Sequence, residues 1–330
     1  MSRLNVVDQP ADIKRKIHQQ AKPLGGGIAI FLAFFLSICT AYYTGVIGSV
    51  ISLDHILALV IGGAIITIGG FLDDVYRFSY YPQLIAPVLA SLVVIGFSIG
   101  PEAVTNPFGG VFRLDNITLS FGPIENWVLL SDLVVFVWLM GVMFTTKLLD
   151  GLDGLVSGIV AIGAVVIFFL TLQPQWFQPE MSIVSIILAA SMLGFLVWNW
   201  HPAKIFLGES GSLLAGFLLG SLAILSGAKI ATGLLVLGVP MLDMIRVVIR
   251  RAQKDQHIFV GDKEHLHFKL LRSGLNQRQA VLLFYAISFL FGISTIFLQS
   301  KHKLIALLFL LVLMLIIGAW FSKQDQNNEN

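Results

Sequence analysis

Charged residues are scarce in this chain of 330 residues: they make up 12% of it, whereas a soluble globular protein carries roughly 25%. Because 56% of the residues are apolar, that shortage excludes both a soluble globular domain and a disordered chain. Cysteine is scarcer still, and the single Cys39 excludes a scaffold built from disulfides. The net charge of +2 gives no basis for nucleic-acid binding. The class that remains is a polytopic membrane protein.

Long, continuous apolar runs are abundant. A membrane-spanning helix needs about 20 apolar residues, and these runs lack the two-residue alternation of a transmembrane β-barrel. We therefore predict an all-α polytopic integral membrane protein with a single transmembrane domain over residues 1–321 and a polar, disordered tail over 322–330. The ten expected transmembrane helices cover residues 25–47, 54–72, 82–100, 128–147, 155–172, 182–199, 212–226, 229–249, 279–299 and 303–321.

The connections between these helices predict an orientation. With the amino terminus in the cytoplasm, 17 of the 21 Lys and Arg lie on the cytoplasmic side, and the exceptions are Arg113, Lys229, Lys301 and Lys303. This is the asymmetry that the positive-inside rule describes. The longest connection on the other side, residues 101–127, alternates apolar residues with Gly, Asn and Pro, which predicts a small extracytoplasmic β-hairpin.

Acidic residues gather at the predicted cytoplasmic ends of helices. Asp73 and Asp74 end the second helix in GFLDDVYR, where a carboxylate opposes the helix dipole and costs about 2.5–3.5 kcal/mol if it lies within the membrane. Such a pair can simply mark the membrane boundary. Since neighbouring positions on a helix point about 100° apart, we instead predict separate roles, in which one carboxylate orients a partner and the other takes a proton.

Two further acids, Asp150 and Asp153, lie three residues apart in DGLDG, close to Lys147. The alternative to a functional role is N-capping of the fifth helix, which Asp153 is well suited to provide. Each acid is followed by glycine, which lets the backbone approach a ligand closely. We therefore predict that both belong to a binding site.

Glu209 lies in IFLGESGS, a glycine-rich turn at the start of the seventh helix. Backbone N–H groups at such a position favour anions, including phosphate, and a carboxylate there suits Mg²⁺ with a diphosphate completing its coordination. Asp243, in the eighth helix, is expected to face the same cleft.

The pair His265 and His267 follows the eighth helix in a basic segment. On its own an HxH pair is typical of solvated histidines, and zinc is disfavoured because no cysteine lies nearby. Beside Lys263, Lys269 and Arg272, the two histidines suit a phosphate.

Five segments in this order resemble the polyprenyl-phosphate N-acetylhexosamine-1-phosphate transferases, the glycosyltransferase family 4 type that includes phospho-MurNAc-pentapeptide translocase. They are VDQPADIKRKIHQQAKPLGGG, GFLDDVYR, LLDGLDGL, NWHPAKIFLGESGSL and DKEHLHFKLLRSGLNQRQAV. The resemblance implies transfer of a sugar 1-phosphate from a UDP-sugar to a polyprenyl phosphate, with release of UMP. It also implies a requirement for Mg²⁺, or Mn²⁺ in its place, and a multi-pass protein of the bacterial cytoplasmic membrane whose active site faces the cytoplasm, often as a homodimer.

The resemblance also assigns roles to residues. It makes Asp73 and Asp74 the acidic pair associated with the lipid phosphate, one of them a general base, and it makes Glu209 the metal ligand. The remaining assignments are catalytic roles near the nucleotide or phosphates for Asp153, His265 and His267, and substrate-binding roles for Lys16, Lys147, Asp150, Asn199 and Phe206.

Three positions depart from the family pattern. Glu209 stands where the family usually has Asp, Lys147 where it usually has Asn, and Phe268 where the histidine motif often continues with another His. An ammonium group cannot ligate a metal. We therefore expect Lys147 to supply part of the positive charge that a metal gives the diphosphate, while a degenerate relative with little activity is the alternative.

The choice of donor rests on the amino-terminal and histidine segments, which are more similar to the UDP-GlcNAc branch than to the UDP-MurNAc-pentapeptide branch. An ion-coupled transporter is the alternative from another class. A transporter is expected to place its acids near the bilayer midplane at broken helices, whereas these lie at one interface. A noncatalytic scaffold gives no reason for five polar segments on one face.

Overall fold

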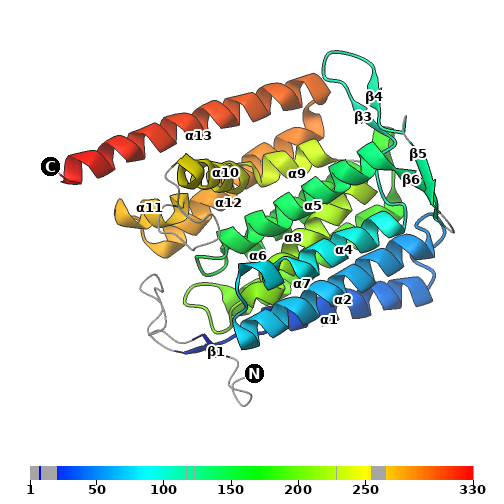
Figure 1. The fold of residues 1–330 in the computed structure, drawn as a ribbon, viewed down its shortest axis with the longest axis horizontal. Helices are drawn as coiled ribbons and strands as arrows, with labels where there is room; N and C mark the ends of the chain where they lie inside the picture. The colour runs from blue at the N-terminus through cyan, green and yellow to red at the C-terminus, as the bar shows by residue number, and fades with distance from the viewer. Residues whose placement is uncertain are drawn as a thin grey trace.

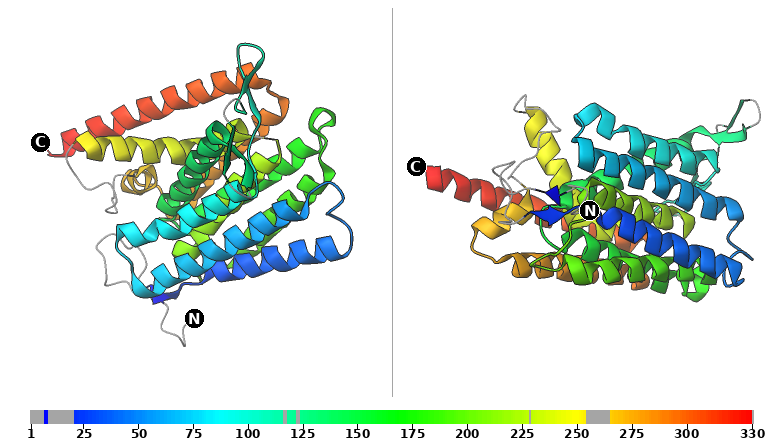
Figure 2. Two further views of the ribbon diagram at one scale, coloured as in Figure 1. Left: turned by 45° about the vertical axis from the view of Figure 1, so that its right-hand side comes forward. Right: turned by 90° about the horizontal axis from the view of Figure 1, so that it is seen from below.

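The computed structural model describes residues 7–8, 21–115, 118–121, 124–227, 229–253 and 265–329. Its helices lie roughly side by side, with two β-hairpins at one end of the bundle (Figure 1, Figure 2). The α-helices are α1 Gly26–Tyr43, α2 Leu53–Tyr76, α3 Tyr80–Gln83, α4 Ile85–Gly96, α5 Leu129–Leu149, α6 Leu155–Thr171, α7 Pro179–Asn199, α8 Gly208–Leu225, α9 Ile230–Val236, α10 Gly238–Gln253, α11 Leu266–Arg272, α12 Gln277–Phe297 and α13 Ser300–Glu329.

The strands form three short antiparallel pairs. They are β1 Val7–Asp8 with β2 Lys22–Pro23, β3 Ala103–Thr105 with β4 Val111–Arg113, and β5 Thr118–Phe121 with β6 Ile124–Val128. The connection from 101 to 127 therefore holds two hairpins where one was predicted. Between β3 and β4 the chain reverses at Gly109 and Gly110, both at positive φ. We call this end of the molecule the hairpin end.

The described residues confirm an all-α membrane protein. Seven helices are long and apolar enough to span a bilayer: α1, α2, α5, α7, α8, α12 and α13. Two more of the ten expected segments are apolar but shorter. One is formed by α3 together with α4, and the other is α6. The eighth expected helix, 229–249, is not continuous, because α9 and α10 meet at an angle of 80°. Gly238 and Pro240 explain the break: proline fits the first turn of a new helix but not the interior of a continuous one.

The carboxyl end also differs from expectation. The backbone of α13 is helical as far as Glu329, so residues 322–329, expected to be disordered, continue the last helix. Glutamine and lysine are good helix formers. Extending an existing helix also avoids the cost of nucleating a new one.

The core is centred on α8. Every residue of α8 from Ser210 to Ile224 is buried, because α8 packs against α1, α2, α5, α6 and α7. The Trp138 indole of α5 donates a hydrogen bond of 3.0 Å to the Gly220 carbonyl of α8. The central helix thereby positions its amino terminus, at Gly208, at the opposite end of the bundle from the hairpins (Figure 1).

At the hairpin end, one carboxylate holds the connection between α1 and α2. Glu180, in the first turn of α7, accepts backbone hydrogen bonds of 2.8–2.9 Å from Gly48, Ser49, Val50 and Ile51. These four N–H groups would otherwise lack partners in a partly buried turn. The contact fixes α1, α2 and α7 relative to one another.

Candidate active site

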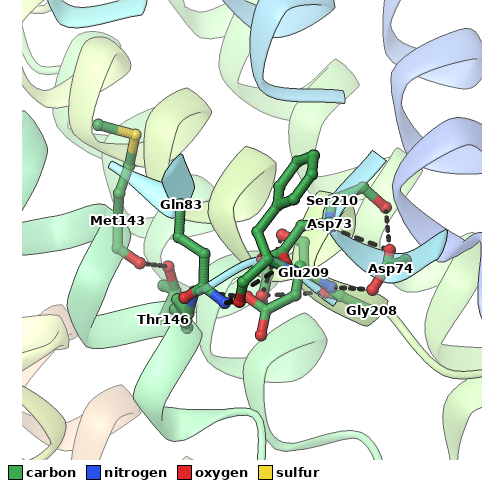
Figure 3. A network of polar contacts seen from close by, with 11 residues as sticks. Asp73, Asp74, Gln83, Met143, Thr146, Gly208, Glu209 and Ser210 are labelled. Carbon is green, nitrogen blue, oxygen red and sulfur yellow. Dashed lines mark hydrogen bonds and ion pairs between the residues drawn. The ribbon is translucent and has the colours of Figure 1, made fainter. Parts of the chain in front are cut away.

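The polar segments meet at the end of the bundle opposite the hairpins, which we call the polar end. Its centre is formed by the carboxyl end of α2, the turn that follows it, the last turn of α5 and the first turn of α8 (Figure 3). Arg77 ends α2 in a left-handed conformation, with φ at 53°, and this turns the chain back so that α3 lies beside the end of α2. The structure thus brings residues 73–83 against residues 208–210.

Asp74 caps α8. Its Oδ1 accepts a hydrogen bond of 2.8 Å from the Glu209 backbone N–H, and its Oδ2 accepts one of 3.1 Å from the Ser210 hydroxyl. Gly208 lies directly against this carboxylate: a Cβ there would be 2.5 Å from Oδ2, and the backbone has φ at +71°. Glycine is therefore required at position 208. The anion that the amino terminus of α8 holds in this structure is the Asp74 side chain.

Asp73 points to a different set of groups, as expected for neighbouring positions of a helix. Its side chain is buried, and its Oδ1 accepts hydrogen bonds of 2.8 Å from the Phe78 N–H and 3.3 Å from the Gln83 amide. Both described hydrogen bonds reach Oδ1, so Oδ2 is the oxygen left for a ligand.

Gln83 is a site residue that sequence reasoning missed. Its amide nitrogen donates to Asp73 and, at 2.9 Å, to the Phe78 carbonyl, while its amide oxygen accepts a hydrogen bond of 2.7 Å from the Lys147 ammonium. The only available signal was a single amide in the short, mostly aromatic segment after Arg77. Gln83 joins an acid of α2 to a cation of α5.

Lys147 is the cation of this cluster. Its ammonium lies 2.9 Å from Glu209 Oε2 and is largely buried, with 13% of the side chain exposed, whereas Glu209 is 34% exposed. The ammonium is also close enough to Asp73 for their charges to interact. Asp73 of α2, Gln83 of α3, Lys147 of α5 and Glu209 of α8 thus form a continuous chain of polar contacts across four elements of the bundle.

The loops that flank the cluster are fixed by Asp153 and Asn199. Asp153 Oδ2 lies 2.7 Å from His201 Nδ1 and accepts a hydrogen bond of 3.0 Å from the Ala203 N–H. Capping of α6 by Asp153 is not observed; the N-cap of that helix is Gly154, with no side-chain cap. Asn199 instead anchors the start of α6, because its Oδ1 accepts hydrogen bonds of 3.0 Å from the Gly154 N–H and the Ser157 hydroxyl.

Asn199 also donates a 3.0 Å hydrogen bond to the Ile205 carbonyl and is only 3% exposed. Its amide is therefore committed to the protein interior, where it ties the start of α6 to the loop before α8. Asp150 lies at the end of α5, exposed at the polar end.

Phe206 lies where the amino-terminal segment meets the loop before α8. Its N–H donates to the Pro23 carbonyl at 3.1 Å, and its carbonyl accepts from the Gly26 N–H at 3.1 Å. The Lys22 ammonium lies 5.2 Å from the centroid of the Phe206 ring, within range of a cation–π interaction. Lys16, predicted to bind substrate, lies outside the described residues.

The histidine pair is more buried than expected. His265 Nδ1 lies 2.9 Å from Asp243 Oδ2, and the same oxygen accepts a 3.0 Å hydrogen bond from the Leu266 N–H. His267 stacks on His265 and is 2% exposed. Burial, with the His265 charge as a second cause, lowers the pKa of His267 to about 3, so its imidazole is neutral at physiological pH.

The His267 ring lies on the loop that carries Asp150 and Asp153. A Cβ at Gly151 would be 2.3 Å from His267 Nε2, and this nitrogen has no hydrogen-bond partner among the described residues. The bend between α9 and α10 places Asp243, and through it His265 and His267, beside this loop. The predicted site residues that the structure describes thus lie at the polar end in separate contact groups. Lys147 pairs with Glu209, Asp153 with His201, and His265 with Asp243.

Mg²⁺ was expected here. Within the described ranges, no group of three or more His, Cys, Asp or Glu residues is arranged as a metal site. Mg²⁺ is usually held by one or two carboxylates and by phosphates of the substrate. Asp73 and Glu209 match the protein's share of such a site, because both face Lys147 and neither is needed to cap a helix.

Comparison with known proteins adds independent information. The profile of glycosyl transferase family 4 matches residues 56–227. The chain is 32% identical, over 95% of its length and 83% of the relative's, to a probable undecaprenyl-phosphate N-acetylglucosaminyl 1-phosphate transferase of Bacillus subtilis. It is 29% identical to the decaprenyl-phosphate N-acetylglucosaminephosphotransferase of Mycobacterium leprae, over 86% of the chain and 74% of the relative. It is 30% identical to a phospho-N-acetylmuramoyl-pentapeptide-transferase of Halalkalibacterium halodurans, over 86% of both chains.

Proposed function

The chain belongs to glycosyl transferase family 4, and we propose that it transfers GlcNAc-1-phosphate from UDP-GlcNAc to a polyprenyl phosphate, releasing UMP. The product, a lipid diphosphate sugar, is of the kind that starts a cell-envelope polysaccharide. One observation carries the proposal: carboxylates and one ammonium, linked by Gln83, converge at the membrane-boundary end of a bundle of spanning helices. A water-soluble nucleotide and a membrane-bound phosphate can both reach such a place.

In the proposed reaction, an oxygen of the lipid phosphate forms a bond to the β-phosphorus of UDP-GlcNAc. The bond between that phosphorus and the bridging oxygen breaks, and the oxygen leaves with UMP. Catalysis of this kind depends on positioning the phosphates and neutralising their charge. Of the two acids that end α2, Asp73 has the oxygen available to orient the lipid phosphate or to accept its proton.

Asp74 has a positioning role in this proposal. Its two oxygens hold the N–H and hydroxyl groups at the start of α8, so it fixes Glu209 against Lys147. Asp153 and Asn199 likewise shape the loop that presents Phe206, on whose ring a uracil can stack. His267 packs against Gly151 of the DGLDG loop, and His265 stacks on His267.

Mg²⁺, held by Asp73 and Glu209 together with the diphosphate, would supply positive charge to the phosphate oxygens. Lys147 supplies positive charge from the protein itself, fixed between Glu209 and Gln83. The arrangement of these side chains therefore prepares the site for a diphosphate.

The donor is tested directly by supplying membranes that contain the protein with undecaprenyl phosphate and either radiolabelled UDP-GlcNAc or radiolabelled UDP-MurNAc-pentapeptide. We expect labelled lipid and equimolar UMP with UDP-GlcNAc only. The longer and more identical match to the GlcNAc transferase of Bacillus subtilis supports this choice. Labelling from the pentapeptide donor alone would assign the chain to the other branch, and no labelling from either would refute transfer.

We further propose that the polar end faces the cytoplasm of a bacterium. Arg113, Lys229, Lys301 and Lys303 lie at the hairpin end, whereas cations such as Lys22, Arg77, Lys147 and Lys204 lie at the polar end, in keeping with the positive-inside rule. The test starts from a Cys39→Ala background. On intact cells, a membrane-impermeant maleimide is expected to label Phe108→Cys, in the β3–β4 turn, but not Ser273→Cys, after α11. The reverse pattern would invert the orientation.

A further inference from the structure

A groove lies between α1 and α7 on the outside of the bundle. Its volume is about 540 Å³, within the range of about 300–1,000 Å³ that is typical of small-molecule sites. It is lined by the first turns of α1 and the last turns of α7, so it lies in the membrane half next to the polar end. Apart from Ser191 and Lys204, its lining is apolar: Ala29, Ile30, Ala33, Ala190, Gly194, Phe195, Trp198 and Ile205.

The groove exists because small side chains face each other there. A Cβ built on Gly194 would meet no atom within 4 Å, so the space beside it is open rather than filled by α1. On the same part of α7, Leu193 and Val197 are 48% and 75% exposed. In a spanning bundle, such side chains face lipid. The groove therefore opens toward the acyl chains of the bilayer.

Its polar end carries a positive charge. The Lys204 backbone N–H donates a 2.8 Å hydrogen bond to the Trp198 carbonyl, and the Lys204 ammonium lies 5.0 Å from the centroid of the Trp198 ring. Trp and Lys are both typical of the membrane–water boundary. An apolar groove that ends in an ammonium at this depth matches, in shape and charge, a lipid that carries an apolar chain and a phosphate.

We propose that this groove binds an anionic phospholipid of the same leaflet, with one acyl chain along the apolar floor and its phosphate on Lys204. Lys204 belongs to the loop between α7 and α8. That loop is tied to the active site by Ala203, which donates to Asp153, and by Ile205, which accepts from Asn199. Phe206 follows in the same loop. The bound lipid therefore holds the segment that presents Phe206, and it raises the transferase rate.

The binding part of this proposal is independent of the proposed function, whereas the effect on rate rests on it. Native mass spectrometry of the full-length protein, purified with equal amounts of phosphatidylglycerol and phosphatidylcholine, measures binding. We expect one retained phosphatidylglycerol. Gly194→Leu, which fills the groove, and Lys204→Gln, which removes the charge, are each expected to lower its retention at least fivefold.

Gly96→Leu is the matched control, since a Cβ at Gly96 also meets no atom within 4 Å but Gly96 ends α4 near the hairpins. Equal retention in all four proteins, or equal retention of the two lipids by wild type, would overturn the proposal. So would a retained polyprenyl phosphate in place of the phospholipid, or a Gly194→Leu protein that changes from dimer to monomer, because these outcomes identify another occupant.

UMP release in nanodiscs with and without phosphatidylglycerol then tests the effect on rate. We expect the stimulation in wild type and Gly96→Leu, and its loss in Gly194→Leu and Lys204→Gln with basal release retained. If phosphatidylglycerol is retained but does not change UMP release, the regulatory step is wrong. An absence of UMP release from every protein under all conditions would instead refute the proposed function.

Discussion

Replacing Gln83 with Met removes the link between Asp73 and Lys147 while keeping the length of the side chain. The change deletes the 2.7 Å hydrogen bond from the Lys147 ammonium and the 3.3 Å hydrogen bond to Asp73. A hydrogen bond to a charged group contributes about 1.5–3 kcal/mol. If the positions of Asp73 and Lys147 matter in the transition state, losing the stronger of the two lowers kcat/KM by roughly 10- to 150-fold.

The assay is UMP release from UDP-GlcNAc with purified protein and undecaprenyl phosphate. Most of the loss is expected in kcat, because in the proposed mechanism Gln83 orders the two side chains that act on the phosphates. Gln83→Glu is expected to stay impaired, since a carboxylate can accept from Lys147 but cannot donate to Asp73. Gln175→Met, an exposed glutamine at the hairpin end, serves as the control.

A double-mutant cycle with Lys147→Met separates this linkage from general damage. If Gln83 acts by holding Lys147, the two substitutions together cost less than the sum of their separate effects. A Gln83→Met protein with kcat/KM within twofold of wild type, or strictly additive effects in the cycle, would refute the reasoning.

Three further predictions follow from charges fixed in the structure. Lys147→Asn is expected to make UMP exchange more dependent on Mg²⁺, because the variant lacks the protein's own positive charge, so the fraction of exchange that survives EDTA falls below that of wild type. Complete, equal metal dependence in both proteins would contradict a charge-supplying role for the ammonium. Glu180→Gln is expected to lower the free energy of unfolding by about 2 kcal/mol, seen as a lower Tm in detergent with kcat/KM intact, whereas the exposed Glu102→Gln leaves both unchanged. Burial, with Lys303 nearby, lowers the pKa of Lys229 from 10.5 to about 8. Between these two pH values the unfolded chain carries a proton on Lys229 that the folded protein has lost, so the free energy of unfolding rises with pH from about 8 to 10.5. Lys229→Met is expected to flatten this part of the plot of Tm against pH. An equal slope in both proteins would refute the prediction.

The sequence was informative about the membrane and about which segments converge. Apolar runs of helical length gave the spanning segments because the bilayer demands continuous apolar helices. The same parity argument that placed the cations also placed GFLDDVYR and IFLGESGS on one face of the membrane, and the structure joins them through Asp74 and the start of α8. Both predictions depend only on the length and order of segments along the chain, which a single sequence contains.

The hydrogen bonds of individual side chains could not be predicted from segment length and order. Asp73 and Asp74 look equivalent in sequence, and only the arrangement of α2 against α8 shows that one caps a helix while the other holds Gln83. Asn199 was expected to contact substrate, yet its amide is committed to Gly154, Ser157 and Ile205. A polar residue near a site satisfies either the ligand or the backbone, and the choice depends on which buried N–H groups lack partners.

The balance of charge explains why these residues act as a group. The Lys147 ammonium interacts with the carboxylates of Asp73 and Glu209, and the Asp74 carboxylate lies beside Glu209. A diphosphate would bring more negative charge to the same place. One ammonium does not neutralise such an assembly, so binding of the nucleotide sugar requires further cations. Lys22 beside Phe206 provides one from the protein, and we propose that a divalent cation arriving with the diphosphate would provide the rest. In this proposal the excess of carboxylates couples the two ligands. A diphosphate alone meets an unfavourable charge, whereas a cation is attracted to the carboxylates and, once bound, removes that repulsion.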